Sequence, residues 1–177
     1  MESGVLRARG EAPLDWSRQL ESRALLIAGI RSVDLSGLVP PGQSDFTRAG
    51  GALAAFRLQF GEGSSEVRPE HRDTLEQVAA TIKTLDQLAQ ARGEELSVEV
   101  VGHTDSTGPD SANKRLGLNR ATRTAQALER AGVRNAVFHL RSAGSAEPIA
   151  GEGSESERQL NRCVTFRVLR PSPAAHP

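Results

Sequence analysis

The chain has 177 residues, of which 37% are hydrophobic and 25% charged, a balance typical of a soluble globular protein. A chain of this length can bury a core without disulfides or a metal. Its formal net charge is zero and it has few aromatic residues, with no tyrosine, so it lacks both the positive charge that attracts nucleic acid or anionic lipid and the rings on which bases stack.

Residues 1–51 are predicted to form a small N-terminal segment that ends in a linker. Residues 1–12 are polar and contain glycine, so we expect them to be loose. Asp15 is a candidate N-cap for a helix that Gly29 would end, and residues 30–35 then alternate as in a short strand. This helix–strand pair resembles the second half of a BON domain.

The early part of the chain shows no membrane-spanning run and no signal peptide. Its most apolar run, residues 24–30, lies between Arg23 and Arg31 and is far shorter than the ~20 residues that a membrane helix needs. No recognisable cleavage site follows it. The run is therefore not predicted to be a membrane helix or a signal peptide.

A linker, a main domain and a tail are predicted to follow. Residues 38–51 contain Pro40-Pro41-Gly42, a sequence typical of a linker. The main domain then covers residues 52–170, and residues 171–177 are predicted to be a disordered tail.

Hydrophobic periodicity predicts the order β-α-β-α-β-β in the main domain. Apolar residues alternate in the strands and recur at spacings of three and four in the helices. The elements are strands over 54–60, 96–101, 137–140 and 164–169, and helices that begin near Pro69 and Asn113 and end at Gly93 and Gly132. Right-handed crossovers place both helices on one face of the sheet. The predicted fold class is therefore α/β, a two-layer α/β sandwich with a mixed four-stranded sheet.

Several short motifs occur in a fixed order along the main domain. They are Gly102-His103-Thr104-Asp105, Gly108, Asn113 and Arg120-Ala121, then Gly144 and Pro148, and last Arg158, Asn161, Arg162 and Val164-Thr165-Phe166. Together they resemble the OmpA-like peptidoglycan-binding domain family of outer-membrane protein A, Pal and MotB. The resemblance covers residues 52–170, and several motifs in order are far more specific than one.

Three positions depart from the family's pattern. Gly117 stands where the family usually has serine, Glu157 where it has glycine, and Cys163 where it has a second arginine. Cys163 is the only cysteine, so no intrachain disulfide is possible, and a lone cysteine is typically a small buried residue.

The resemblance implies non-covalent binding of peptidoglycan through the diaminopimelate of the stem peptide. The family residues that match Asp105 and Arg120 bind the free D-centre of meso-diaminopimelate, a zwitterion. A carboxylate can accept from its ammonium, and a guanidinium can clamp its carboxylate through two bonds. Both side chains are expected on a pocket wall, with Thr107, Gly108, Asn113 and Arg162 completing the ligand-binding set.

Each of these residues also has a purely structural interpretation. Asp105 could form only an Asx-turn, and Arg120 could be a surface residue paired with Glu129 or Asp110. Asn113 is a candidate helix N-cap, a ligand contact, or both.

Two further assignments follow from the same segment and from the closing motif. Thr107 and Gly108 are expected to shape the loop. Arg158 and Arg162 are equally well explained as pocket residues and as partners of neighbouring glutamates.

Catalytic, metal and cofactor sites are not predicted. His103, Asp105 and Ser106 are close in sequence, but alternate residues of a strand-like segment face opposite ways and cannot form a triad. The four histidines and one cysteine lack the spacing of metal ligands, and no phosphate-binding loop is present.

The sequence therefore predicts a non-enzymatic module, without cofactors, that anchors a protein or assembly to the cell wall. Its expected partner is peptidoglycan, and its expected location is the periplasm or cell envelope, associated with the outer membrane. The alternative is an OmpA-like fold used as a protein–protein interaction domain without wall binding.

Overall fold

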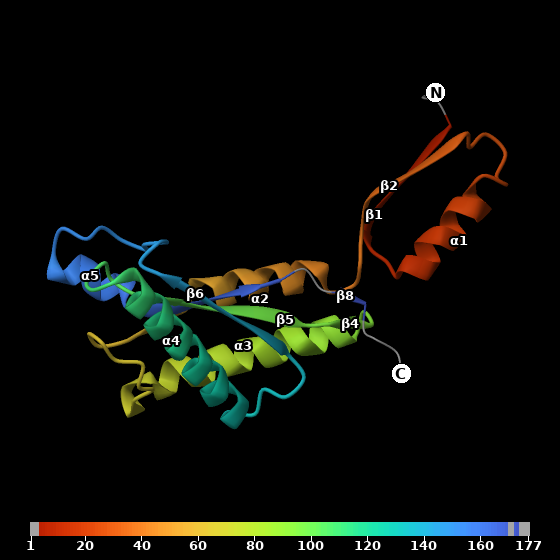
Figure 1. Cartoon of the computed structure of the whole chain (residues 1–177). Helices are drawn as coiled ribbons and strands as arrows, with labels where there is room; N and C mark the ends of the chain where they lie inside the picture. Colours follow the sequence, from red (N-terminus) through yellow and green to blue (C-terminus); the bar gives the residue numbers. More distant parts are fainter. Residues whose placement is uncertain (1–3, 170–171, 174–177) are drawn as a thin grey trace. The chain divides into compact units, whose positions relative to one another are not determined.

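A computed structural model describes residues 4–169 and 172–173 of the chain. The chain divides into two compact units, Met1–Thr47 and Arg48–Pro177 (Figure 1). Within the described residues, no helix combines the length and the apolar character needed to cross a membrane.

The N-terminal unit is a β-α-β element. Strand β1 (Val5–Glu11) pairs in parallel with β2 (Ser32–Val39), and α1 (Leu14–Ala24) connects them. The prediction that residues 1–12 are loose is therefore wrong for β1. Its own sequence alternates only weakly, and pairing with β2 supplies the backbone hydrogen bonds that hold it extended.

The boundaries of the predicted helix and strand in this unit shift by a few residues. The helix begins one residue before Asp15, with Pro13 as its N-cap, and ends at Ala24 because a turn follows well before Gly29. The strand predicted over residues 30–35 starts and ends later, as β2. The resemblance to a BON domain stays a prediction.

The main unit carries the rest of the chain's helices and strands. Its described elements are α2 (Gln43–Ala55), which begins just before the unit, β3 (Arg57–Gln59), the 3-10 helix η1 (Pro69–His71), α3 (Arg72–Gln90), β4 (Glu94–Glu95), β5 (Ser97–His103), α4 (Asp110–Arg130), β6 (Val137–Gly144), α5 (Glu155–Asn161), β7 (Cys163–Val168) and β8 (Ser172–Pro173).

The central sheet has the strand order β3-β7-β5-β6. Strand β5 runs parallel to β6 and antiparallel to β7, and β7 runs antiparallel to β3, so the sheet is mixed. In register, Val100 of β5 lies between Phe166 of β7 and Leu140 of β6. The predicted α/β fold with a mixed four-stranded sheet is confirmed.

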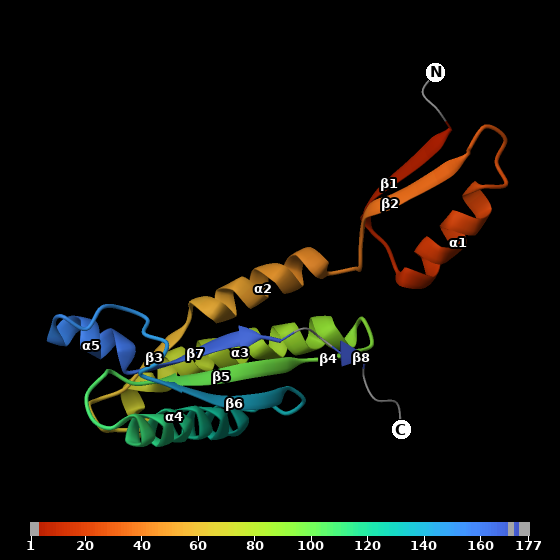
Figure 2. The same ribbon diagram turned by 45° about the horizontal axis from the view of Figure 1, so that its top comes forward.

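Helices α3 and α4 pack beside each other, and α4 lies along β5 and β6 (Figure 2). The hydrophobic periodicity that predicted them places their apolar stripes in the core. Fully buried core residues are Val78, Ile82 and Leu85 of α3, Leu128 of α4, Val98 and Val100 of β5, and Val164 of β7.

The linker predicted over residues 38–51 is wrong at both ends, because β2 extends to Val39 and α2 begins at Gln43. Gly42 has a φ of 70°, so the proline–glycine run forms a turn that starts a helix. Leu53 is fully buried, and a Cβ at Gly50 would meet a Val168 methyl group at 3.6 Å. Helix α2 is therefore held against the end of β7.

Two regions near the C-terminus also differ from the prediction. The segment between the third and fourth predicted strands, for which no helix was predicted, contains α5, whose N-cap Ser154 forms a capping box with Glu157. In the predicted disordered tail, β8 pairs with β4, so that part of the prediction is wrong. Residues 171 and 174–177 lie outside the described residues.

Candidate ligand-binding site

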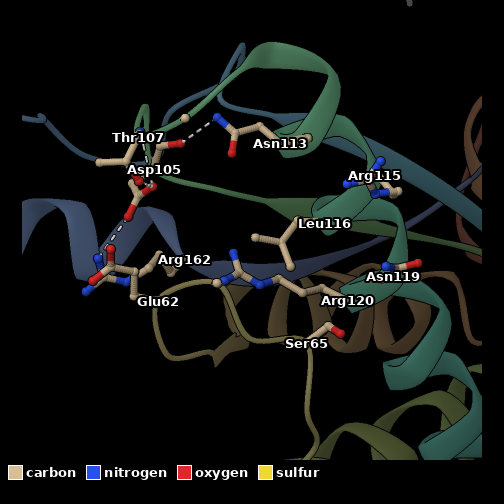
Figure 3. Close-up of a pocket in the computed structure, with 13 residues that line it drawn as sticks. Glu62, Ser65, Asp105, Thr107, Asn113, Arg115, Leu116, Asn119, Arg120 and Arg162 are labelled. Atoms are coloured by element: carbon tan, nitrogen blue, oxygen red, sulfur yellow. Dashed lines mark hydrogen bonds and ion pairs between the residues drawn. The ribbon is translucent and has the colours of Figure 1, made fainter.

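A cavity of about 550 Å³ lies between the loops that follow β3 and β5 and the first three turns of α4 (Figure 3). The six predicted site residues all line it: Asp105, Thr107, Gly108, Asn113, Arg120 and Arg162. The structure therefore brings together residues that are up to 57 positions apart in the sequence. Whether they bind a ligand stays a prediction.

A close backbone contact between β5 and α4 sets the position of the cavity. A Cβ added to Gly102 would lie 1.8 Å from the Gly117 carbonyl oxygen. One added to Gly117 would lie 2.3 Å from the Ser142 Oγ and 2.6 Å from the Gly102 carbonyl oxygen. The glycine at position 117, where the family usually has serine, is thus required by this contact. The contact also brings Arg120, almost one turn later on α4, to the end of β5.

Asp105 is buried at the end of β5 and is already paired. Its Oδ1 accepts hydrogen bonds from the backbone nitrogen of Thr107, at 3.3 Å, and from the Thr107 hydroxyl. Its Oδ2 accepts from Nη1 of Arg162 at 2.8 Å. Burial alone raises the pKa of Asp105, but these hydrogen bonds and the charge of Arg162 outweigh it and hold the pKa below its ordinary value. The Asx-turn is present, and an ion pair accompanies it.

Arg162 links the cavity to α5. Its guanidinium donates to Glu155 through Nη2 and to the Gln159 Oε1 through Nε, at 3.2 Å, in addition to its bond with Asp105. The hydrogen bond to Glu155 raises the pKa of Arg162. Arg158 instead donates to Glu155, at 3.1 Å, and to the Glu152 carbonyl, at 3.2 Å. Of the two arginines left open by the sequence, Arg162 is the one that lines the cavity.

Arg120 is fully buried, so its interpretation as a surface residue is wrong. Nε donates to the Ser64 carbonyl at 2.8 Å, Nη1 to the His103 carbonyl at 2.7 Å, and Nη2 to the Gly61 carbonyl at 2.9 Å. The guanidinium carbon also lies 5.4 Å from the centre of the Phe60 ring. Three of its five N–H groups are satisfied by the backbone, which leaves one on each Nη.

Arg120 forms no ion pair with a carboxylate among the described residues, although the charge of nearby Asp105 acts to raise its pKa. Asp110, one predicted partner, pairs with Lys114 at 2.8 Å instead. Burial lowers the pKa of Arg120 to about 10, so the group stays charged at neutral pH. A buried cation that donates hydrogen bonds only to carbonyls, with two N–H groups left, is suited to receive an anion.

Asn113 lies in the first turn of α4, so its prediction as N-cap is wrong. The helix begins at Asp110, with Pro109 as the N-cap. The buried Asn113 amide donates to the Asp105 carbonyl at 3.4 Å. Gly108 has a φ of 87°, a conformation that favours glycine, so it shapes the loop as predicted.

The side chain of His103 does not line the cavity and has hydrogen-bond partners elsewhere. Its ring nitrogens lie 3.0 Å from the Glu147 carbonyl oxygen and 3.0 Å from the Thr165 hydroxyl. Burial lowers its pKa. Its ring contacts neither Asp105 nor Ser106 through any described hydrogen bond, so the geometry gives no nucleophile–base pair.

Sequence reasoning missed the role of Asn161, which the family motif contains. Its fully buried side chain accepts from the backbone nitrogens of Ile149, at 2.7 Å, and Ala150, at 2.8 Å. It also donates to Glu152 at 2.6 Å, and Glu152 in turn accepts from Ser106 at 3.2 Å. Asn161 therefore fixes one loop, which contacts the loop that carries Asp105.

Further lining residues were not predicted. They are Glu62, Gly63, Ser65, Ala112, Arg115, Leu116 and Asn119. Helical spacing could have found those on α4, because Ala112, Arg115, Leu116 and Asn119 share one face with Arg120. No sequence signal marks the residues of the loop after β3.

The OmpA family matches residues 59–162, more than half of the chain. The chain belongs to the OmpA family. It is 41% identical over 72 residues to outer membrane porin F of Pseudomonas fluorescens, across 41% of this chain and 22% of that protein. It is 26% identical over 145 residues to the peptidoglycan-binding protein ArfA of Mycobacterium bovis, across 78% of this chain and 42% of ArfA.

Among solved structures, the chain is similar to the peptidoglycan-associated lipoprotein of Burkholderia pseudomallei. The TM-score is 0.55 at 26% identity, and the match covers 66% of this chain and 92% of that one. The resemblance inferred from the sequence motifs is confirmed. The chain spans less than two thirds of the length of the curated relatives it matches.

Proposed function

We propose that the main unit binds peptidoglycan non-covalently and anchors whatever carries it to the cell wall. Two similar proteins, ArfA and the lipoprotein of Burkholderia pseudomallei, are named for peptidoglycan binding or association. The observation that carries the proposal is the buried Arg120 guanidinium, without a carboxylate partner, in the same cavity as Asp105. Because peptidoglycan lies outside the cytoplasm, the same proposal implies a location in the periplasm or cell envelope.

The proposed ligand group is the free D-centre of meso-diaminopimelate. Its carboxylate accepts the two N–H groups of Arg120 that the backbone leaves unused. Its ammonium donates to Asp105, where three hydrogen bonds are already made and one acceptor position of the carboxylate remains. In this proposal the ligand shares the Asp105 carboxylate with Arg162. Asn113, Thr107 and Gly108 shape the wall of the site.

The proposed activity is recognition without cleavage. Hydrolysis of a peptide or glycan requires an activated nucleophile or a general acid–base pair. Asp105 is held ionised by Arg162 and Thr107, which favours charge recognition over proton transfer. We therefore expect bound wall material to remain intact.

Co-sedimentation with purified sacculi tests the proposal. The wild-type protein should pellet with diaminopimelate-type sacculi and release no soluble muropeptides. Asp105→Asn should remain largely in the supernatant, while Asp110→Asn, which removes an exposed carboxylate from the same helix start, should pellet like wild type. Wild-type protein that stays in the supernatant would favour the interaction-domain alternative, and muropeptide release would contradict the non-enzymatic proposal.

A further inference from the structure

Glu62 is a second carboxylate at the cavity. It lines the cavity and is exposed, on the loop between β3 and η1. In the part of the chain that the structure describes, no hydrogen bond or ion pair engages its side chain. In this it differs from Asp105, whose carboxylate is held by Thr107 and Arg162. Figure 3 draws Glu62 toward the end of the cavity that holds Asp105 and Arg162, and draws Arg115 toward the other.

The backbone on both sides of Glu62 is fixed by Arg120. The guanidinium holds the Gly61 carbonyl through Nη2, at 2.9 Å, and the Ser64 carbonyl through Nε, at 2.8 Å. The Ser64 nitrogen also donates to the Gly61 carbonyl at 3.2 Å, which closes a turn around Glu62 and Gly63. The residue that supplies the unpartnered cation therefore also sets the place of the unpartnered carboxylate.

A count of hydrogen bonds shows that Asp105 cannot satisfy a ligand ammonium alone. An ammonium has three N–H groups, and the Asp105 carboxylate has roughly four acceptor positions, of which three are occupied. At most one N–H can be accepted there while Arg162 stays in place. A second acceptor at the same end of the cavity would give the ammonium a further hydrogen bond.

We propose that Glu62 is that acceptor and makes the site selective for a ligand with an ammonium beside its carboxylate. The inference rests on the proposed function and deepens it. Arg120 binds the ligand carboxylate, and Asp105 and Glu62 together bind the ammonium. Glu62 keeps more contact with water than Asp105 and contributes less to binding.

The test compares two variants on two ligands. The ligands are a disaccharide tripeptide whose only amine is the D-centre amine of meso-diaminopimelate, and the same molecule acetylated at that amine. Glu62→Gln removes the proposed acceptor charge with little change in shape. Glu66→Gln is the matched control, because Glu66 is an exposed carboxylate six residues before the start of α3 that does not line the cavity. Dissociation constants are measured by calorimetry, with thermal melts for all proteins.

We expect Glu62→Gln to bind the free-amine ligand about two- to fivefold more weakly than wild type, as for an exposed ion pair. The difference should shrink in high salt and vanish for the acetylated ligand, and Glu66→Gln should match wild type throughout. Equal binding of the free-amine ligand by Glu62→Gln and wild type would overturn the role of Glu62 and leave the proposed function standing. An equal loss for both ligands would overturn it too. No binding by the folded wild-type protein would overturn the proposed function itself.

Discussion

The two charged ends of the cavity are built in opposite ways. At one end, Arg120 is fully buried, donates to three backbone carbonyls and has no carboxylate partner among the described residues. At the other end, Asp105 is also buried but is paired with Arg162 and capped by Thr107. The Arg120 end therefore keeps two unused N–H donors, whereas most acceptor positions of Asp105 are already occupied by the protein itself.

Because of this difference, we expect Arg120 to contribute to both the stability of the fold and ligand binding, and Asp105 to contribute mainly to ligand binding. Arg120 holds the loop after β3 and the end of β5 in place, so its removal affects folding and binding together. Asp105 is held through a chain of side chains that ends on α5, and Arg162 keeps Glu155 and Gln159 when Asp105 is lost. The two residues are expected to contribute unequally to stability, although both are proposed to bind the same ligand group.

The largest effect is expected for Arg120→Lys. One ammonium cannot reach three carbonyls that a planar guanidinium joins, so at least one buried acceptor is left unsatisfied. We expect the free energy of unfolding to fall by about 3 kcal/mol and ligand binding to be lost. Urea unfolding followed by circular dichroism measures the stability. Stability equal to that of wild type would show that the three carbonyl contacts are not an anchor.

The next effect is expected for Asp105→Asn. The substitution removes the charge and keeps the shape, and Arg162 retains its other partners, so unfolding should become easier by only about 1–2 kcal/mol. Binding of the diaminopimelate ligand should weaken by more than about tenfold, because the ammonium loses its buried counter-charge. The same unfolding assay, with calorimetric titration, measures both. A stability loss as large as that of Arg120→Lys would remove the contrast between the two ends.

The stability difference between wild type and Asp105→Asn is expected to depend on pH. Because the pKa of Asp105 lies below its ordinary value in the folded protein, its stabilising contribution is fully present above the unfolded pKa of about 4 and is lost as the pH falls through the folded pKa. The stability gap between wild type and Asp105→Asn should therefore be constant near neutrality and close in strong acid. A gap that closes already between pH 7 and 5 would mean that Arg162 does not hold the carboxylate ionised.

The smallest effect is expected for Arg158→Gln. Its partner Glu155 is exposed, and Arg158 does not line the cavity. Such pairs contribute little, so stability should change by less than about 0.5 kcal/mol and binding should be unchanged. The matched variant Arg162→Gln should weaken both. If Arg158→Gln had the larger effect on binding, the assignment of the two arginines would be reversed.

The strands and long helices of the main unit could be predicted because their apolar residues repeat with a clear period. The elements that were not predicted lack a clear hydrophobic period. Strand β1 contains Arg7, Arg9 and Gly10 and depends on pairing with β2. Helix α2 contains Gly50 and Gly51, which are rare inside helices, and it is stabilised by packing. Helix α5 had a sequence signal, the capping box of Ser154 and Glu157.

The sequence could predict residues that line one cavity, but not the hydrogen bonds and ion pairs between them. Motif order placed Asp105 and Arg120 together, because the end of a strand and the helix that follows it are local in the chain. The hydrogen bond between Asp105 and Arg162 joins residues 57 positions apart, and hydrophobic periodicity gives no information about contacts at that separation. The burial of Arg120 was hidden for a similar reason, since two of the carbonyls that it holds belong to the loop after β3.

The proposed function depends most on the Arg120 guanidinium, which we expect to receive the carboxylate of the ligand's D-centre. The most direct measurement is calorimetric titration of the wild-type protein with a diaminopimelate muropeptide and with the same muropeptide amidated at that carboxylate. Amidation removes the negative charge of the ligand and leaves the ammonium, so we expect binding that is at least about tenfold weaker. Equal affinity for the two ligands would contradict it.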